Sequence, residues 1–207
     1  MGKNNNVQYG CAWSAPKNWA NFDCSPTLRF EKIPFIGKLY TKNEHRFPDN
    51  VCYGDIVKGL PISNNSCDFI YCSHVLEHLS LNDCRRALRN TYKVMKNSAI
   101  FRFVLPDLEH CVNEYINDSK ISALELMRSL DIGLEERPNT ITSNIYNYLQ
   151  NSKHYWMWDY IALKNELENI GFRKIRRASF GDSDYKIYNT IEEYSRWENC
   201  LGIECQK

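Results

Sequence analysis

The chain carries almost no net charge. Its 26 basic and 25 acidic residues leave a formal charge of +1 at pH 7. Proteins that bind nucleic acid usually present a basic patch or stripe. The densest basic run, residues 173–177, includes Ile175 and resembles the exposed face of a strand. We therefore expect no nucleic-acid partner.

Long apolar runs are also absent. No stretch approaches the roughly 18 apolar residues that a membrane-spanning helix needs. The first ten residues, MGKNNNVQYG, lack the apolar segment of a signal peptide. The 9 cysteines form no C-x-x-C pair, so their spacing does not suit a zinc ribbon. We expect a cytoplasmic protein without a membrane partner, in which cysteine acts as a small reduced hydrophobic residue.

Short apolar segments alternate with amphipathic ones along the chain. The 207 residues suffice for one domain, and we expect a single domain over 1–207. An irregular insertion is expected at about 27–50, where Pro34, Gly37 and Pro48 interrupt any regular period. No internal repeat and no low-complexity segment is present. The composition is that of an ordinary globular protein.

The clearest block of the sequence predicts a strand, a helix and a second strand. Cys67–Cys72 is short, apolar and β-prone, Ser80 can cap a helix, and Ala99–Leu105 is a strong strand closed by Pro106. Such a βαβ unit joins parallel strands. Further strands are expected at 7–9, 19–22, 51–55, 172–179 and 200–205, and helices at 108–116, 121–130, 141–149 and 159–169. The pattern predicts an α/β fold, with a mostly parallel sheet covered by helices on both faces.

Three residues with ligand-binding character stand at successive strand ends. Gly10 follows the first strand, Asp23 the second, and Asp55 the third. Ligands of open α/β sheets bind beyond the carboxyl ends of the strands, where a glycine permits close approach and an acidic residue can accept ribose hydroxyls. The order of these residues favours a nucleotide-like ligand.

These residues and their neighbours resemble the class I S-adenosylmethionine-dependent methyltransferases, of the type-11-like branch. The resemblance rests on segments spread over most of the chain: YGCA at 9–12, NWANFD at 18–23, GDI at 54–56, CDFIYCSHVLEHL at 67–79 and RFVLPDL at 102–108. It implies a Rossmann-like sheet of seven strands whose last strand, near 200–205, is antiparallel. The sequence departs from the family at Ala12, which stands where a second glycine is usual, and Trp13 follows directly.

The resemblance also implies a cofactor and its site. S-adenosyl-L-methionine would lie across the tips of the first strands. The residues implied in binding it are Gly10, Cys11 and Ala12 at the methionine part, Asp23 at the ribose, Asp55 near the adenine, and Ser73 near the methyl group. The implied reaction is methyl transfer to a small-molecule acceptor, with a hydroxyl of a sugar or glycan precursor as one acceptor class.

His74 is the leading candidate for the catalytic base, and Glu77 and Asp107 are the alternative bases. Histidine has a suitable unperturbed pKa, and His74 comes first after a strand that ends at the site. The alternative is that His74 caps a helix or lines the floor of the site. Asp107, Tyr155 and Trp156 are the candidate acceptor-pocket residues.

Two other functions stay open on the sequence alone. The loop after the first strand, in which Ala12 stands where a second glycine is usual, is compatible with a non-catalytic protein that binds the cofactor or a partner. His74 and His78, with Glu77 beside them, match the H-x-x-E-H pattern of zinc hydrolases. We expect no metal, because that pattern belongs inside a long helix whereas His74 directly follows a strand. The sequence leaves the oligomeric state open, a homo-oligomer included.

Overall fold

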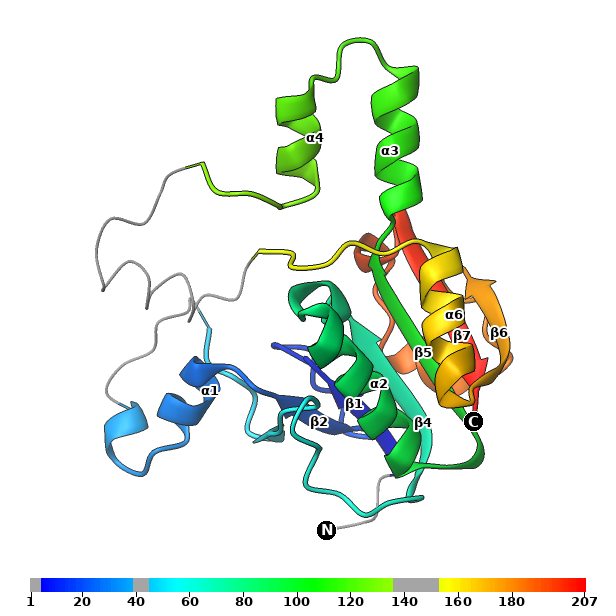
Figure 1. The fold of residues 1–207 in the computed structure, drawn as a ribbon. Coiled ribbons are helices and arrows are strands. Elements are labelled where there is room, and N and C mark those ends of the chain that lie inside the picture. The colour runs from blue at the N-terminus through cyan, green and yellow to red at the C-terminus, as the bar shows by residue number, and fades with distance from the viewer. Residues whose placement is uncertain (1–4, 39–44, 136–152) are drawn as a thin grey trace.

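The computed structural model describes residues 5–38, 45–135 and 153–207. A seven-stranded sheet in the order β3-β2-β1-β4-β5-β7-β6 forms its centre (Figure 1). Strand β7 is antiparallel to both β5 and β6, and the other pairings are parallel. The strands are β1 (Asn6–Tyr9), β2 (Ala20–Asp23), β3 (Val51–Tyr53), β4 (Cys67–Ser73), β5 (Met95–Pro106), β6 (Arg173–Ala178) and β7 (Cys200–Gln206). The predicted α/β sheet with a reversed last strand is confirmed.

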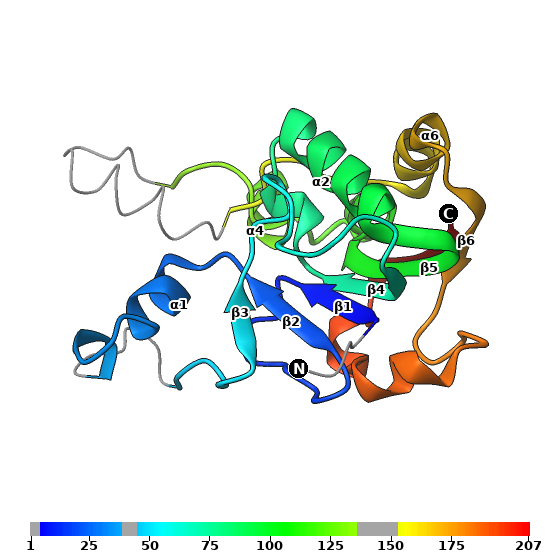
Figure 2. The same cartoon turned by 90° about the horizontal axis from the view of Figure 1, so that it is seen from below.

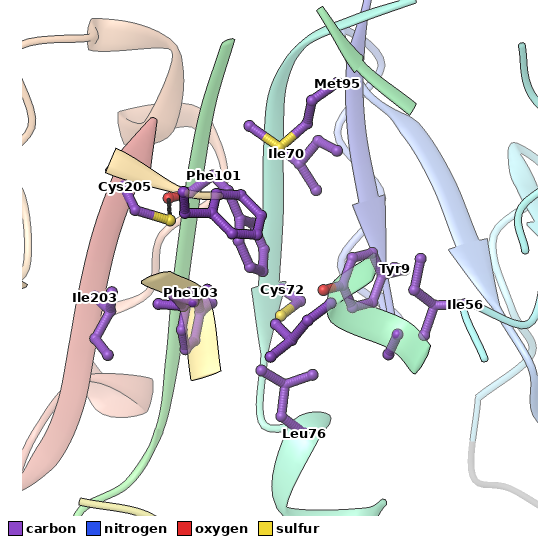
Figure 3. Packing of buried hydrophobic residues seen from close by; sticks show 14 of the residues in the cluster. Tyr9, Ile56, Ile70, Cys72, Leu76, Met95, Phe101, Phe103, Ile203 and Cys205 are labelled. Carbon is purple, nitrogen blue, oxygen red and sulfur yellow. Dashed lines mark hydrogen bonds between the residues drawn. The ribbon is translucent and has the colours of Figure 1, made fainter. Parts of the chain in front are cut away.

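Two helices, α2 (Leu81–Val94) and α6 (Tyr160–Ile170), cover one face of the sheet. The Ser80 hydroxyl accepts a hydrogen bond from the Asp83 N–H, so α2 begins where the sequence predicts. Helix α6 is capped by Asp159 and ends at Gly171, whose φ of 114° suits glycine. The core between these helices and the sheet contains Tyr9, Ile70, Phe101 and Phe103 together with Cys72 and Cys205 (Figure 3).

The connection between β6 and β7 covers the opposite face. It contains two 3-10 turns, η3 (Lys186–Thr190) and η4 (Tyr194–Arg196), which lie on the side of the sheet away from α2 (Figure 2). Its aromatic side chains Tyr188 and Trp197 pack on Trp19 and Tyr71. The described residues between β1 and β2 form turns rather than a helix, so the β6–β7 connection is the main cover of this face.

Arg102 fastens the β6–β7 connection to the sheet. Its side chain is fully buried in β5, and its guanidinium lies 4.5 Å from the ring centroid of Trp197. The guanidinium donates to Asp182 at 2.9 Å and to Glu204 at 3.2 Å, and it also pairs with Glu192. Three carboxylates thus compensate one buried cation, as a buried charge requires.

The remaining elements lie at the edges of the sheet. They are α1 (Pro26–Glu31), η1 (Ile36–Lys38), η2 (Leu76–His78), α3 (Leu108–Asn117) and α4 (Ala123–Ser129). Helices α3 and α4 stand beyond the carboxyl end of β5, and none of their side chains is buried (Figure 1). No helix among the described residues has the length and apolar character to cross a bilayer.

Two expectations differ from the structure, and a third falls on residues that it does not describe. The stretch at about 27–50 was expected to be irregular, but it holds α1, which begins at a proline favoured in a first helical turn and capped by Ser25. The strand expected at Ala99–Leu105 begins earlier, because β5 starts at Met95 directly after α2. The helix expected at 141–149 lies outside the described residues.

Candidate functional site

The ends of β1, β2 and β4 meet at one edge of the sheet. Tyr9 pairs with Phe22 on one side and with Cys72 on the other, so the three parallel strands end in register. The residues that follow, Gly10, Asp23 and Ser73, therefore leave the sheet side by side. The structure brings together three of the predicted cofactor residues.

Gly10 is required by the close approach of two loops. Its φ is +64°, and a Cβ at this position would lie 2.2 Å from Cγ2 of Val75 in the loop after β4. Both facts exclude a side chain, because L-residues disfavour this conformation and the space is occupied. The glycine predicted from the strand-end pattern is thus explained by packing against Val75.

The carboxylate of Asp23 organises the backbone around it. Its Oδ2 accepts from the N–H of Ala12 at 3.0 Å, and its Oδ1 accepts from the N–H of Ser25 at 2.8 Å. Asp23 is 9% exposed. Each oxygen keeps a lone pair, so the carboxylate still has capacity for a further donor. Asp23 thus holds the loop after β1 and the start of α1 at the site.

A hollow opens beside Gly10, on the face covered by the β6–β7 connection. Its space, with the open solvent at its mouth included, amounts to about 360 Å³. Its lining consists of Gln8, Gly10, Cys11, Ser14, Tyr71, Ser73, Ile191, Glu193 and Arg196. Side chains alternate along a strand, so Gln8, Tyr71 and Ser73 face this hollow while their neighbours Tyr9 and Cys72 enter the core.

Three polar groups at the hollow lack partners. The Ser73 hydroxyl is buried and has no hydrogen-bond partner in the described part of the chain. Among the described residues, the exposed side chains of Glu193 and Arg196 form no ion pair. Sequence reasoning missed Glu193 and Arg196, since charged residues in an exposed turn carry no local signal of a site.

His74 is held in an unusual conformation next to the hollow. It is a non-glycine residue with φ of 54°. Its Nδ1 lies 3.2 Å from Oε1 of Glu77, and its Nε2 donates to the carbonyl oxygen of Arg196 at 3.0 Å. Burial opposes a charged imidazole here, but interactions with Cys200, the Glu77 carboxylate and the Arg196 carbonyl outweigh it and raise the pKa of His74 to about 10.

This charge state does not favour the predicted role of His74. A histidine with such a pKa is an imidazolium at neutral pH, which donates protons and has no lone pair to accept one. The geometry also disfavours His74 with His78 as a zinc pair: Leu76–His78 is a single 3-10 turn, and both nitrogens of His74 are engaged.

Of two further predicted cofactor residues, Cys11 lines the hollow and Asp55 does not. Cys11 is buried and lines it, and burial with the nearby Asp23 carboxylate raises the pKa of the Cys11 thiol to about 12. Asp55 lies after β3, where its Oδ1 accepts from the N–H of Val57 at 2.9 Å and its Oδ2 lies 3.2 Å from Nζ of Lys58.

The predicted acceptor residues do not line this hollow. Asp107 caps α3 by accepting from the N–H of Glu109 at 3.0 Å. Tyr155 is 54% exposed and Trp156 is 43% exposed. Their backbone N–H groups both donate to the carbonyl oxygen of Glu77, at 2.8 Å and 3.2 Å, which fixes them at the loop after β4.

Trp13 does not close the hollow. Its ring stacks on Phe47 with a centroid separation of 5.7 Å and an interplanar angle of 20°. Its indole N–H donates to the carbonyl oxygen of His45 at 3.1 Å. The departure from the family at this position therefore directs the ring toward the 45–47 segment.

Comparisons with known proteins agree with this geometry. A solved S-adenosylmethionine-dependent methyltransferase from Archaeoglobus fulgidus is 17% identical, with a TM-score of 0.50 over 98% of this chain and 85% of that one. A structure described as PigF with SAH is 16% identical, with a TM-score of 0.52 over 98% of this chain and 50% of that one, so this chain spans about half of PigF. The chain has the fold of class I methyltransferases.

A comparison with models of protein families matches part of the chain to one methyltransferase family. Residues 33–103 match the type-11 methyltransferase family, described as a methyltransferase domain. The resemblance to the type-11 branch is thereby confirmed over this part of the chain. A comparison with curated proteins finds no match.

Proposed function

We propose that this chain transfers the methyl group of S-adenosylmethionine to a hydroxyl of a small molecule. The observation that carries the proposal is the hollow at the ends of β1 and β4, where the Ser73 hydroxyl, Glu193 and Arg196 have unused polar capacity. The class I fold and the family match support the same cofactor.

The polar groups of the hollow fit the amino-acid end of the cofactor. That end carries a carboxylate and an ammonium group, which complement Arg196 and Glu193 through charge-assisted hydrogen bonds. A helix N-terminus after β1 would otherwise supply N–H groups to an anion, but the described residues between β1 and β2 form no helix. We assign that task to Arg196.

Asp23 would bind the ribose through its remaining lone pairs, with its orientation fixed by the N–H groups of Ala12 and Ser25. Gly10 would permit close approach of the backbone. Asp55, after the neighbouring strand β3, would stand near the adenine.

When bound, the cofactor supplies an electrophilic methyl group on a sulfonium. The protein then has to align the acceptor, exclude water and take up the proton that the acceptor hydroxyl releases, for which Asp107 would be the base. His74 would act as a positioning cation, because it fixes Arg196 through the main-chain carbonyl. Tyr155 and Trp156, held at the same loop through Glu77, would cover the acceptor. Sugar hydroxyls are the first acceptor class to screen.

Calorimetry with S-adenosylmethionine and S-adenosylhomocysteine tests the proposal. We expect both to bind the full chain. Arg196→Gln should weaken binding by about 5–150-fold, the effect of losing one charge-assisted hydrogen bond of about 1–3 kcal/mol. Arg86→Gln is the control, since Arg86 lies on α2 with a half-exposed side chain that pairs with Asp83. Failure of both ligands to bind would overturn the enzyme and favour a non-catalytic protein.

Asp23→Ala tests a different part of the site. We expect weaker cofactor binding, again by about 1–3 kcal/mol, together with lower stability, because two backbone N–H groups lose their acceptor. Unchanged affinity would refute the assignment of Asp23 to the ribose. Methyl transfer from labelled cofactor to a panel of sugars and other hydroxyl compounds then tests the acceptor class.

A further inference from the structure

Glu77, His78 and His154 form a cluster that the proposed methyl transfer does not use. Glu77 and His78 belong to η2, and His154 precedes α6. One ligand atom from each residue lies within 4.8 Å of the other two. Nε2 of His78 is 4.0 Å from Oε1 of Glu77, and the two imidazole centroids are 4.9 Å apart.

Nε2 of neither histidine takes part in a hydrogen bond with the residues that the structure describes. Nδ1 of His78 lies 3.2 Å from the carbonyl oxygen of Lys153, and Nδ1 of His154 lies 2.7 Å from that of Leu130. A carbonyl can only accept, so each Nδ1 carries a proton and, in the neutral ring, Nε2 has the lone pair. Histidines that bind metals commonly donate their second ring N–H to a carbonyl in this way.

Glu77 is a buried carboxylate with unused acceptor capacity beside the two histidines. Its side chain is 0% exposed, and neither carboxylate oxygen has a hydrogen-bond partner in the described part of the chain. The His74 imidazolium lies 3.2 Å from Oε1 and pairs with the carboxylate, whereas Oε2 has neither an ion-pair contact nor a hydrogen bond among the described residues. A buried oxygen without a partner is costly, and a metal ion bound to the carboxylate would reduce that cost.

Backbone hydrogen bonds hold the segment that follows His154 next to the turn that contains Glu77 and His78. The carbonyl oxygen of Glu77 accepts from the N–H groups of Tyr155 and Trp156, directly after His154. Ligands bonded to zinc at about 2.0–2.2 Å in a tetrahedron lie about 3.4 Å apart. The ligand atoms therefore need to move inward by about 1 Å on binding, which rotation of the imidazoles can supply.

We propose that Glu77, His78 and His154 bind one divalent metal ion of the Zn²⁺ class. Two histidines and one glutamate are the donor set of open zinc sites, in which water takes the fourth position. The ligand set differs from the H-x-x-E-H reading of the sequence, because His154 replaces His74. Only the fold brings His154 to η2.

Metal titration of the purified full chain tests the site without any need for methyl transfer. After treatment with a chelator and its removal, we expect calorimetry to show one Zn²⁺ bound per chain. Co²⁺ should bind at the same site and give the visible absorption of a low-coordinate complex. Binding of Zn²⁺ should raise the melting temperature.

Three variants decide whether these residues are the ligands. Glu77→Gln and His154→Ala should each lower Zn²⁺ affinity at least about tenfold, since loss of even an outer partner has an effect of this size. His110→Ala is the matched control, because His110 lies 3.5 Å from Glu114 in an exposed pair on α3. Glu77 is buried, so a loss of affinity in Glu77→Gln can also arise from misfolding. His154 is only partly buried, and His154→Ala therefore tests the site independently. Absence of 1:1 binding, wild-type affinity in His154→Ala, or an equal loss in His110→Ala would overturn the proposal.

Discussion

Replacement of Gly10 by alanine tests the contact between the loops that follow β1 and β4. The new Cβ would lie 2.2 Å from Cγ2 of Val75, and the backbone φ is +64°. Gly181 provides a matched control, since its φ is +71° and nothing lies within 4 Å of the position of its Cβ. The two alanine variants share the conformational cost and differ in the steric one.

The conformational and steric costs of the two alanine variants can be estimated separately. A left-handed conformation costs an L-residue about 1–2 kcal/mol, and the reduced freedom of the unfolded chain returns about 0.4–1 kcal/mol. Gly181→Ala should therefore destabilise by about 1 kcal/mol. Overpacking adds about 1–3 kcal/mol, so Gly10→Ala should destabilise by about 2–4 kcal/mol in total.

Val75→Ala should remove the steric part. It deletes Cγ2 and leaves Cβ of residue 75 at 3.5 Å, an ordinary contact. Urea unfolding of the wild type, Gly10→Ala, Val75→Ala and the double variant gives the coupling free energy. We expect a coupling of about 1–3 kcal/mol, with the cost of Gly10→Ala reduced to that of Gly181→Ala in the Val75→Ala background. Equal costs for the two glycine variants in the wild-type background, or no coupling, would refute the packing of these loops.

Three other variants probe the rest of the structure. Arg102→Met should lower stability by about 3–5 kcal/mol in urea unfolding, because it leaves the nearly buried Glu192 unpaired; a loss below 1 kcal/mol would contradict that role. The raised pKa of His74 gives a stability contribution that is complete below about pH 6.5 and declines as pH rises to about 10. The difference between wild type and His74→Gln in metal-free buffer should shrink over this window by on the order of 3 kcal/mol, and a constant difference would refute the raised pKa. Asp159→Ala should destabilise by about 1 kcal/mol in thermal unfolding, through loss of the α6 cap, whereas unchanged stability would show that the cap contributes nothing.

Most of the fold could be predicted because its signals are local. Ser80 and Asp159 cap helices through hydrogen bonds to residues three positions on, and Gly171 ends a helix in its own conformation. Cys67–Cys72 forms a strand because a short apolar run between turns suits a buried parallel strand. Helix α1 escaped prediction because it spans only 6 residues next to Pro34 and Gly37.

Only those candidate site residues that lie at the ends of strands could be predicted from the sequence. Gly10, Asp23 and Ser73 are marked by the strands before them. Glu193 and Arg196 reach the same hollow from the far end of the chain, and no local pattern indicates this. The charge of His74 likewise depends on the carbonyl of Arg196, which only the fold brings within 3.0 Å of Nε2.

The β6–β7 connection contributes Glu193 and Arg196 to the hollow because it covers this face of the sheet. The segment between β1 and β2 forms only turns, so the aromatic face of the sheet needs another cover. The β6–β7 connection supplies it, and Arg102 fixes it through Glu192, next to the Glu193 that reaches the hollow. The β6–β7 connection thus brings Arg196 to a hollow at which no helix begins after β1. Substitutions in the β6–β7 connection should therefore lower cofactor affinity more than substitutions in the loop after β1, in which Ala12 stands where a second glycine is usual.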